Sequence, residues 1–397
     1  MTNELRPGIH WVGAVEWSLR HFHGHELSIT RGTSYNAYLI KDGDAVALID
    51  TVKATHAAAF VRDLEKLVSI DQITHIIVCH AEPDHSGALP EIVKRAPKAT
   101  VYCDRGGATT INRHYPGLTS PQIVKTGEVL KLGKRSLRFF EAQMLHWPDS
   151  MFAYCPEEEI LFSNDAFGQH YASSSRFADE VDQAELWQEA MKYFANILTP
   201  YSGQIVKKVN EFLGMKWPIG MICPSHGQIW RKDVTKIVEK YVEWSSGKAE
   251  QSVVLLFDTI WHGTEKMAMA IVRGLDAEGI PYKIFNAGVS DFNDVNTEIL
   301  RSHGLLIGSP TLNNNLMPTI APFLESIRGL RFVNKIGAAF GTYGWSGEGC
   351  KRIEEIMTLG GIKIVQPNLR INYAPSDEEL TKCIQFGRDF AAHLKEG

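Results

Sequence analysis

The segment 80–85 reads HAEPDH and contains four potential metal ligands, which are His80, Glu82, Asp84 and His85. The apolar run just before it, at residues 76–79, is short and rich in β-branched residues, which predicts a strand. Side chains that follow the end of a strand can converge because the backbone turns there. Pro83 argues against a helix in this segment, so we do not expect helical spacing to organise the ligands. The pattern indicates a metal site, and a solvated polar loop is the less favoured interpretation.

Three further single ligands stand in similar surroundings, and they are His146, Asp165 and His226. Asp165 follows a predicted strand at residues 160–162, and His226 follows the apolar residues 221–224. Each of them taken alone is more readily explained as a structural residue with satisfied hydrogen bonds. Together with the 80–85 segment they supply four imidazoles and three carboxylates, all near the ends of apolar runs.

Loops that contain Gly and hydroxyl residues follow three apolar runs in the C-terminal part of the chain. The first loop joins a predicted strand at residues 253–257 to a helical pattern that carries Met267, Ile271 and Leu275 on one face. Backbone N–H groups, hydroxyls and the helix N-terminus can hold a phosphate in such a loop, while a plain helix cap is the simpler alternative. The other two loops follow the third and fourth predicted strands of this part. The candidate cofactor-binding residues of the three loops are Thr259, Ile260, Trp261, His262, Gly263, Thr264, Ser309, Pro310, Thr311, Leu312, Asn313, Asn314, Gly341, Thr342, Tyr343, Gly344 and Trp345.

These three loops together favour FMN as the ligand. In a flavodoxin-like sheet, FMN binds outside the carboxyl ends of the strands, at the point where the strand order reverses. Trp261, Tyr343 or Trp345 could stack on the flavin ring. A dinucleotide is less favoured because no G-x-G-x-x-G follows the first strand, and the G-x-x-x-x-G-K-[ST] pattern of nucleoside triphosphate sites is also absent.

The elements that must position the metal ligands form a mixed α/β part. Short apolar runs that predict strands occur at residues 45–49, 76–79, 100–103 and 160–162. Helical patterns at residues 56–68 and 184–198 lie between some of the runs of this part. This arrangement predicts two buried sheets or one large one.

The elements that must position the cofactor loops form a second part. Five predicted strands alternate with helical patterns, at residues 253–257, 282–285, 305–307, 336–340 and 362–365. Strands joined by helical crossovers predict a doubly wound parallel sheet. Residues 242–251 turn polar after a helical pattern, so we place the domain boundary near residue 250. The predicted domains are residues 1–250, with the metal ligands, and residues 251–397, with the FMN loops.

The composition excludes several classes of protein. A length of 397 residues suggests two or three domains, and 44% hydrophobic with 22% charged residues excludes a disordered or fibrous chain. A net charge of -5 argues against a generally basic nucleic-acid-binding protein. No apolar run is long enough to span a membrane and the first residues lack a secretory signal, so we expect a cytoplasmic protein. The six cysteines include no C-x-x-C pair, so we expect buried thiols and no rubredoxin-type iron site.

The 80–85 segment, followed by His146, Asp165 and His226, resembles the metallo-β-lactamase superfamily, whose usual pattern is H-x-H-x-D-H. Here Glu82 replaces the middle histidine, and the added carboxylate suits iron better than zinc. This variant, in the contexts LHWPDSM around His146 and SNDAFG around Asp165, resembles the flavodiiron proteins over nearly the whole chain. The resemblance implies an N-terminal metallo-β-lactamase-like αββα sandwich followed by a C-terminal flavodoxin-like doubly wound parallel sheet.

The resemblance also implies FMN and two non-heme irons as cofactors, with the seven ligands as the catalytic site. His80, Glu82 and His146 would hold one iron, Asp84, His85 and His226 would hold the other, and Asp165 would bridge them. The implied activity is the reduction of O2 to water or of NO to N2O with electrons passed through FMN, which protects against oxidative or nitrosative stress. His25 would lie near the metals, either tuning substrate handling or as a plain surface histidine.

The same resemblance implies several partners. A separate rubredoxin is the expected electron donor, with a reduced deazaflavin cofactor or a reductase as alternatives. A head-to-tail homodimer, or a dimer of dimers, would place the flavin of one subunit against the metals of the other. We expect neither nucleic acid nor membrane as a partner.

Two other functions stay open at this stage. A zinc-dependent hydrolase of the metallo-β-lactamase superfamily fused to a flavodoxin domain would use the same histidines, and Glu82 argues against it. A non-enzymatic electron shuttle would need no metal site, and the complete ligand set argues against that. The sequence does not distinguish between O2 and NO as the preferred substrate.

Overall fold

The computed structural model describes residues 2–24 and 26–396. The chain divides into two compact units. Unit 1 extends to Tyr193 and resumes over Gly203–Val242, and unit 2 contains Phe194–Ser202 and the chain from Glu243 onward. The main part of unit 2 thus begins within the polar stretch 242–251. Residues 194–202 also belong to unit 2, although the chain before and after them belongs to unit 1, and nothing in the sequence indicates this.

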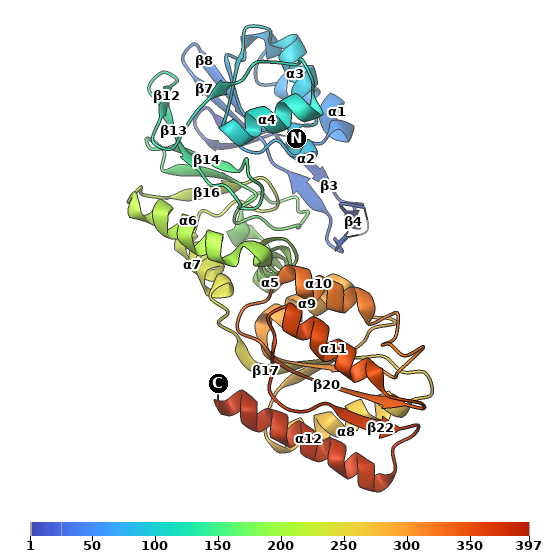
Figure 1. Ribbon diagram of the computed structural model, residues 1–397. Helices are drawn as coiled ribbons and strands as arrows, with labels where there is room; N and C mark the ends of the chain where they lie inside the picture. The colour runs from blue at the N-terminus through green and yellow to red at the C-terminus, as the bar shows by residue number, and fades with distance from the viewer. Residues whose placement is uncertain (1, 25, 397) are drawn as a thin grey trace. The chain divides into compact units, whose positions relative to one another are not determined.

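Unit 1 is built on two main sheets (Figure 1). The larger sheet has the strand order β1 (Asn3–Arg6), β2 (Ile9–Trp11), β7 (Tyr38–Asp42), β8 (Ala45–Ile49), β9 (His75–Ile77), β10 (Thr100–Cys103) and β11 (Gln122–Ile123). The smaller sheet has the order β12 (Val129–Lys131), β13 (Ser136–Glu141), β14 (Met151–Cys155), β15 (Ile160–Asn164) and β16 (Met221–Pro224). Two short pairs are added, β3 (Ala14–Glu16) with β6 (Thr33–Tyr35) and β4 (His21–Phe22) with β5 (Leu27–Ser28).

Both sheets of unit 1 pack into one apolar core. Ile49 and Ile77 of the larger sheet belong to the same buried cluster as Phe139 and Phe162 of the smaller sheet. Every residue of β14 and β15 is buried, which explains why these strands read as continuous apolar runs rather than as an alternating pattern. The two-sheet form of the prediction is therefore correct.

Seven α-helices accompany the sheets over the described part of unit 1. They are α1 (Ala57–Leu64), α2 (Pro83–Ser86), α3 (Leu89–Arg95), α4 (Arg105–His114), α5 (Gln183–Tyr193), α6 (Ser202–Gly214) and α7 (Val234–Ser245). Short helical turns of this unit lie at η1 (Ala54–His56), η2 (Ile70–Gln72) and η3 (Ala178–Glu180), whereas η4 (Phe194–Leu198) and η5 (Thr199–Tyr201) belong to unit 2.

The helix α2 corrects the prediction that the segment 80–85 contains no helix. Pro83 occupies the first position of this one-turn helix. A proline is tolerated there because its missing N–H has no partner inside the helix and its fixed φ suits the first turn. This helical turn follows directly on Glu82, and the N–H of His85 donates to the carbonyl of Glu82 at 2.9 Å.

Unit 2 is a doubly wound parallel sheet with the order β18 (Tyr282–Asn286), β17 (Glu250–Phe257), β19 (Ser302–Gly308), β20 (Ile336–Tyr343) and β21 (Lys363–Ile364). Its helices are α8 (Gly263–Ala277), α9 (Phe292–Arg301), α10 (Ala321–Leu330), α11 (Glu348–Leu359) and α12 (Asp377–Glu396). α8 and α12 lie side by side (Figure 1), and a Cβ on Gly274 would stand 2.1 Å from the carbonyl oxygen of Ile384. A sixth strand, β22 (Leu369–Asn372), also pairs with β20 and was not predicted, because only one of its residues is buried.

Among the described residues, no helix is both long and apolar enough to cross a membrane.

Asn36 ties the N-terminal strands of unit 1 to the loop after β16. Its Oδ1 accepts a hydrogen bond from the indole of Trp11 at 2.8 Å, and its Nδ2 donates to the carbonyl oxygens of Pro224 at 2.8 Å and Gly227 at 3.0 Å. All of these groups are buried; the Pro224 carbonyl also accepts from the Tyr38 hydroxyl at 2.7 Å, whereas Asn36 supplies the acceptor for the Trp11 indole.

We predict that Asn36→Ala lowers the free energy of unfolding by about 1–3 kcal/mol, because the Trp11 N–H would stay buried without an acceptor. Urea unfolding of the variant and the wild type measures the difference. The control is Asn112→Ala on the exposed face of α4, for which we expect a change within about 0.5 kcal/mol. Equal effects of the two substitutions would contradict the assigned role of Asn36.

Candidate metal centre

Seven acidic and imidazole side chains from four places in unit 1 come together, and all seven are buried. They are His80, Glu82, Asp84 and His85 after β9, His146 between β13 and β14, Asp165 after β15, and His226 after β16. β15 and β16 run parallel with Asn164 opposite Pro224, so the residues that follow these strands emerge side by side. The backbone N–H of Met151 donates to the carbonyl of Cys79 at 2.9 Å, which brings the end of β9 to β14.

His80, Glu82 and His146 face one carboxylate oxygen of Asp165. The Nε2 atoms of His80 and His146 lie 3.5 and 3.2 Å from Oδ2 of Asp165. The same two nitrogens lie 3.1 and 3.6 Å from Oε2 of Glu82. These four side chains form the first ligand group.

Asp84, His85 and His226 face the other carboxylate oxygen of Asp165. The Nε2 atoms of His85 and His226 lie 3.0 and 3.6 Å from Oδ1 of Asp165. Both nitrogens also lie 3.2 Å from Oδ2 of Asp84. These three side chains form the second ligand group, and Asp165 presents one oxygen to each group.

The separations fit atoms that share a metal ion. Two ligand atoms about 2.1 Å from one ion and at right angles to each other lie about 3.0 Å apart. Nε2 of His85 and Oδ1 of Asp165 are 3.0 Å apart, yet both are buried without a hydrogen bond of proper alignment to any described residue. Oδ1 of Asp84 is likewise buried without a partner. In the second group, these atoms of His85, Asp84 and Asp165 are close together without being aligned for hydrogen bonds, which points to a common site between them.

Hydrogen bonds at Nδ1 of His80 and His226 leave the Nε2 atom of each ring facing the cluster. Nδ1 of His80 lies 3.0 Å from Oδ1 of Asp149, whose other oxygen accepts from the backbone N–H of Ala81 at 2.9 Å. Nδ1 of His226 donates to the carbonyl oxygen of Ser34 at 2.7 Å. When Nδ1 carries the proton, the lone pair of Nε2 is directed at the cluster, as metal-binding histidines require.

Without a bound metal, the charges within the cluster shift the pKa values of His85 and Asp165 in opposite directions. Burial alone would lower the pKa of His85, but the negative charges of Asp84 and Asp165 raise it to about 9. Burial alone would raise the pKa of Asp165, but the charge of His85 and a hydrogen bond with His146 hold it well below its usual value. The site therefore attracts cations, and protons compete with metal ions for His85.

In unit 2, the first two predicted cofactor loops follow β17 and β19. The third was predicted to begin too early, because β20 continues through Gly341, Thr342 and Tyr343, and only Gly344 and Trp345 follow it. The three strands are neighbours in the sheet. The hydroxyls of Thr264 and Thr342 lie 3.0 Å apart, and the backbone N–H of Thr311 donates to the carbonyl of Thr342 at 2.8 Å. The loops are thus in contact, and Asn313 and Asn314 form an exposed turn on the second of them.

The cradle formed by these loops has features that fit FMN. The hydroxyl of Thr259 is buried without a hydrogen-bond partner among the described residues, close in sequence to the N-terminus of α8. Such a hydroxyl and the first N–H groups of a long helix suit a phosphate. The side chains of Trp261 and Trp345 are 88% and 86% exposed, which leaves their ring faces available to a flat ring.

Several residues of the two sites were not singled out from the sequence. Asp149 holds His80, although it stands only three residues after His146 and its proximity could have drawn attention to it. The resemblance implied a histidine near the metals in the segment 23–25, with the role assigned to His25; Nε2 of His23, on the β4–β5 hairpin, lies 2.7 Å from Oε1 of Glu82. Tyr373, after β22, donates its N–H to the carbonyl of Tyr343 at 2.8 Å. The predicted role of His25 concerns a residue outside the described part of the chain.

Comparison with known proteins identifies the family. A model described as ODP family beta lactamase matches residues 33–227, and a flavodoxin model matches residues 255–387. A nitric oxide reductase of Moorella thermoacetica is 46% identical over 394 residues, which covers 99% of this chain and 98% of the relative. The rubredoxin oxygen:oxidoreductase of Desulfovibrio gigas has a TM-score of 0.97 at 35% identity, covering 100% of this chain and 99% of that one. A flavodiiron protein from Giardia intestinalis has a TM-score of 0.93 at 33% identity, covering 100% and 97%.

The chain belongs to the flavodiiron protein family. Membership confirms the predicted fold class, a metallo-β-lactamase-like domain followed by a flavodoxin-like domain. This flavodiiron protein is an oxidoreductase whose cofactors are FMN and a diiron centre. The alternative of a zinc-dependent hydrolase is not favoured.

We predict that Asp149→Asn weakens metal binding by about 10- to 100-fold. An amide cannot accept hydrogen bonds from both His80 and Ala81 through two oxygens, so the His80 ring would lose its fixed orientation. Competition with a chelator for Fe2+ measures the affinity under anaerobic conditions. Asp44→Asn, in the exposed turn between β7 and β8, is the matched control and should leave the affinity unchanged.

We also predict that Fe2+ binding to the metal-free flavodiiron protein releases protons at neutral pH. The raised pKa of His85, about 9, means that this ring must lose its proton before it binds metal, so the apparent affinity should rise as the pH approaches 9. Titration in weak buffer with a pH indicator counts the protons, and His85→Gln should release fewer. An apparent affinity that does not change between about pH 6 and pH 9 would argue against this assignment.

Proposed function

We propose that His80, Glu82 and His146 bind one iron of the diiron centre, that Asp84, His85 and His226 bind the other, and that Asp165 bridges the two. The observation that carries this proposal is the carboxylate of Asp165, whose two oxygens lie against two separate groups of ligands. The two groups also match in composition, since each contains two imidazoles and one carboxylate besides Asp165.

This composition supports iron rather than zinc. Two histidines and one carboxylate are the ligand set typical of non-heme Fe2+ sites that keep open positions for a substrate. Glu82 completes that set in the first group, at the place where the zinc enzymes of the superfamily usually have histidine. Three carboxylates offset most of the charge of two divalent ions and leave a net positive site, which favours small electron-rich ligands.

We propose that FMN binds in the three loops of unit 2. Thr259, Gly263 and Thr264 would hold its phosphate at the N-terminus of α8, and Trp261 and Trp345 would cover its ring. Ser309 and Thr342 are buried behind the loops and keep them in register. When bound, FMN would take up two electrons and pass them on singly, and the irons would supply single-electron redox chemistry.

We propose that the reaction is the reduction of O2 to water, of NO to N2O, or of both. The names of two relatives support this, since one is a nitric oxide reductase and another is a rubredoxin oxygen:oxidoreductase. The second name also supports a separate rubredoxin as the electron donor, ahead of a reduced deazaflavin cofactor or a reductase. We further propose a cytoplasmic head-to-tail homodimer, in which a second copy would cover the exposed indoles of Trp261 and Trp345.

The proposal is tested by measuring iron and FMN in the purified protein and then the consumption of O2 and of NO with reduced rubredoxin under otherwise equal conditions. We expect about two irons and one FMN for each chain and turnover with at least one of the two gases. Two zinc ions together with hydrolytic activity, and no turnover of either gas, would overturn the proposal.

Three variants separate the two cofactor sites. Asp165→Ala and His226→Ala should lose iron and turnover while the flavin spectrum is kept. Thr264→Trp should lose flavin and keep iron, because Thr264 is fully buried in the cradle. His114→Ala, at an exposed end of α4, is the matched control and should retain both cofactors and full turnover. Joint loss of iron and flavin in Asp165→Ala would contradict the assignment of the cofactors to separate units.

A further inference from the structure

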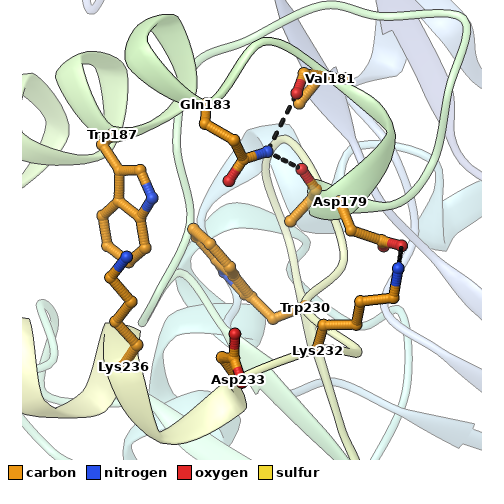
Figure 2. Close-up of a pocket in the computed structure, with 9 residues that line it drawn as sticks. Asp179, Val181, Gln183, Trp187, Trp230, Lys232, Asp233 and Lys236 are labelled. Carbon is orange, nitrogen blue, oxygen red and sulfur yellow. Dashed lines mark hydrogen bonds and ion pairs between the residues drawn. The ribbon is translucent and has the colours of Figure 1, made fainter.

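Unit 1 carries a surface cavity of about 310 Å3 that shares no lining residue with the metal centre (Figure 2). Its walls come from η3, from the N-terminal half of α5, from the segment after β16 and from the start of α7. This volume lies at the lower end of the range typical of small-molecule sites. The side chains that matter for its chemistry are Gln183, Trp187, Trp230, Lys232, Asp233 and Lys236.

Two indoles form the apolar wall of the cavity. Trp230 is only 3% exposed, and its Nε1 donates to the carbonyl oxygen of Phe167 at 2.8 Å, so its ring is held in place. The ring of Trp187 lies 5.1 Å from it between centroids, at an angle of 42°. Trp187 is half-buried, so a flat molecule can pack against its exposed part beside the fixed ring of Trp230.

The charged groups of the cavity are not all paired with one another. Lys232 is engaged, since its Nζ lies 2.8 Å from Oδ2 of Asp179. Nζ of Lys236 lies 4.8 Å from the centroid of the Trp187 ring, and no carboxylate of the described residues lies within ion-pair distance of it. The carboxylate of Asp233 also has no cationic partner among the described residues. Both side chains are exposed, so this ammonium and this carboxylate are accessible to a ligand.

Gln183 adds a polar group of fixed orientation. Its Nε2 donates to the carbonyl oxygens of Ala178 at 2.7 Å and Val181 at 3.0 Å. Figure 2 shows the amide oxygen on the opposite side, turned toward the space beside the two indoles. An amide held in this way presents an acceptor to the cavity.

We propose that this cavity binds a zwitterion with a flat ring, of the chemical class of the aromatic α-amino acids. The ring packs against Trp187 beside the edge of Trp230, the ligand carboxylate pairs with Lys236, and the ligand ammonium pairs with Asp233. A simple aromatic acid would leave Asp233 unpaired beside it, and a simple aromatic amine would leave Lys236 unpaired. Ligand binding in this cavity needs neither iron nor FMN, so the test below can fail or succeed independently of the proposed oxidoreductase function.

Three probes on the intact protein test the proposal by calorimetry or ligand-observed NMR. They are L-phenylalanine, 3-phenylpropionate, which lacks the ammonium, and phenethylamine, which lacks the carboxylate. We expect L-phenylalanine to bind at least about tenfold more tightly than either of the other two, because each lost ion pair removes a charge-assisted contact. Equal binding of the three probes, or no saturable binding of L-phenylalanine, overturns the proposal.

Single substitutions test which charge of the ligand pairs with Lys236 and which pairs with Asp233. Lys236→Met should weaken L-phenylalanine about tenfold and leave phenethylamine unchanged, and Asp233→Asn should weaken L-phenylalanine and leave 3-phenylpropionate unchanged. Lys232→Met is the matched control, because this lysine lines the same cavity but is already paired with Asp179. All three side chains are exposed, so the variants should fold. A loss of binding in Lys232→Met equal to that in Lys236→Met contradicts the proposed pairing.

Discussion

The rest of unit 1 depends on one constraint, that seven titratable side chains stay buried within contact distance of one another. Burying one ionised group without a partner costs several kcal/mol, and like charges placed together cost more. Asp165 offsets part of this electrostatic cost, because its two oxygens lie between the two ligand groups, within 3.0–3.6 Å of four imidazole nitrogens. The fold must therefore hold the end of β15 in register with the loops after β9 and β16.

The register is secured by backbone contacts rather than by the ligands themselves. β15 pairs in parallel with β16, and the N–H of Ser225 continues that ladder by donating to the carbonyl of Asn164 at 2.8 Å. Nδ2 of Asn164 donates to the carbonyl of Cys79 at 3.0 Å, which links the same turn to the end of β9. Three of the four segments that carry the clustered residues are thus joined through main-chain carbonyls, by contacts in which the seven clustered side chains take no part.

Sequence reasoning brought out all seven clustered residues because their signal is local. Four of them adjoin in the segment 80–85, and the others follow or precede apolar runs that are strands in the structure. It failed where the determining contact is remote in sequence. Asp149 contacts His80, which lies 69 positions earlier in the sequence. Residues 194–202 belong to unit 2, and one contact that holds them there is the hydrogen bond from Nδ2 of Asn196 to the carbonyl of Asn293 at 3.2 Å. The helix α2 was excluded by a rule about proline that does not apply to the first turn.

The two units use one structural principle for different chemistry. In unit 2, all three cofactor loops follow parallel strands, and their carboxyl ends share one edge of the sheet. In unit 1, strands β9, β15 and β16, which precede six of the seven clustered residues, also take part in parallel pairs, within sheets whose other pairs are largely antiparallel. Successive parallel strands deliver their following loops to the same edge, whereas antiparallel strands alternate between edges. The parallel pair of β15 and β16 therefore brings Asp165 and His226 together, while hydrogen bonds to the carbonyl of Cys79 join the end of β9, which belongs to the other sheet, to the same place.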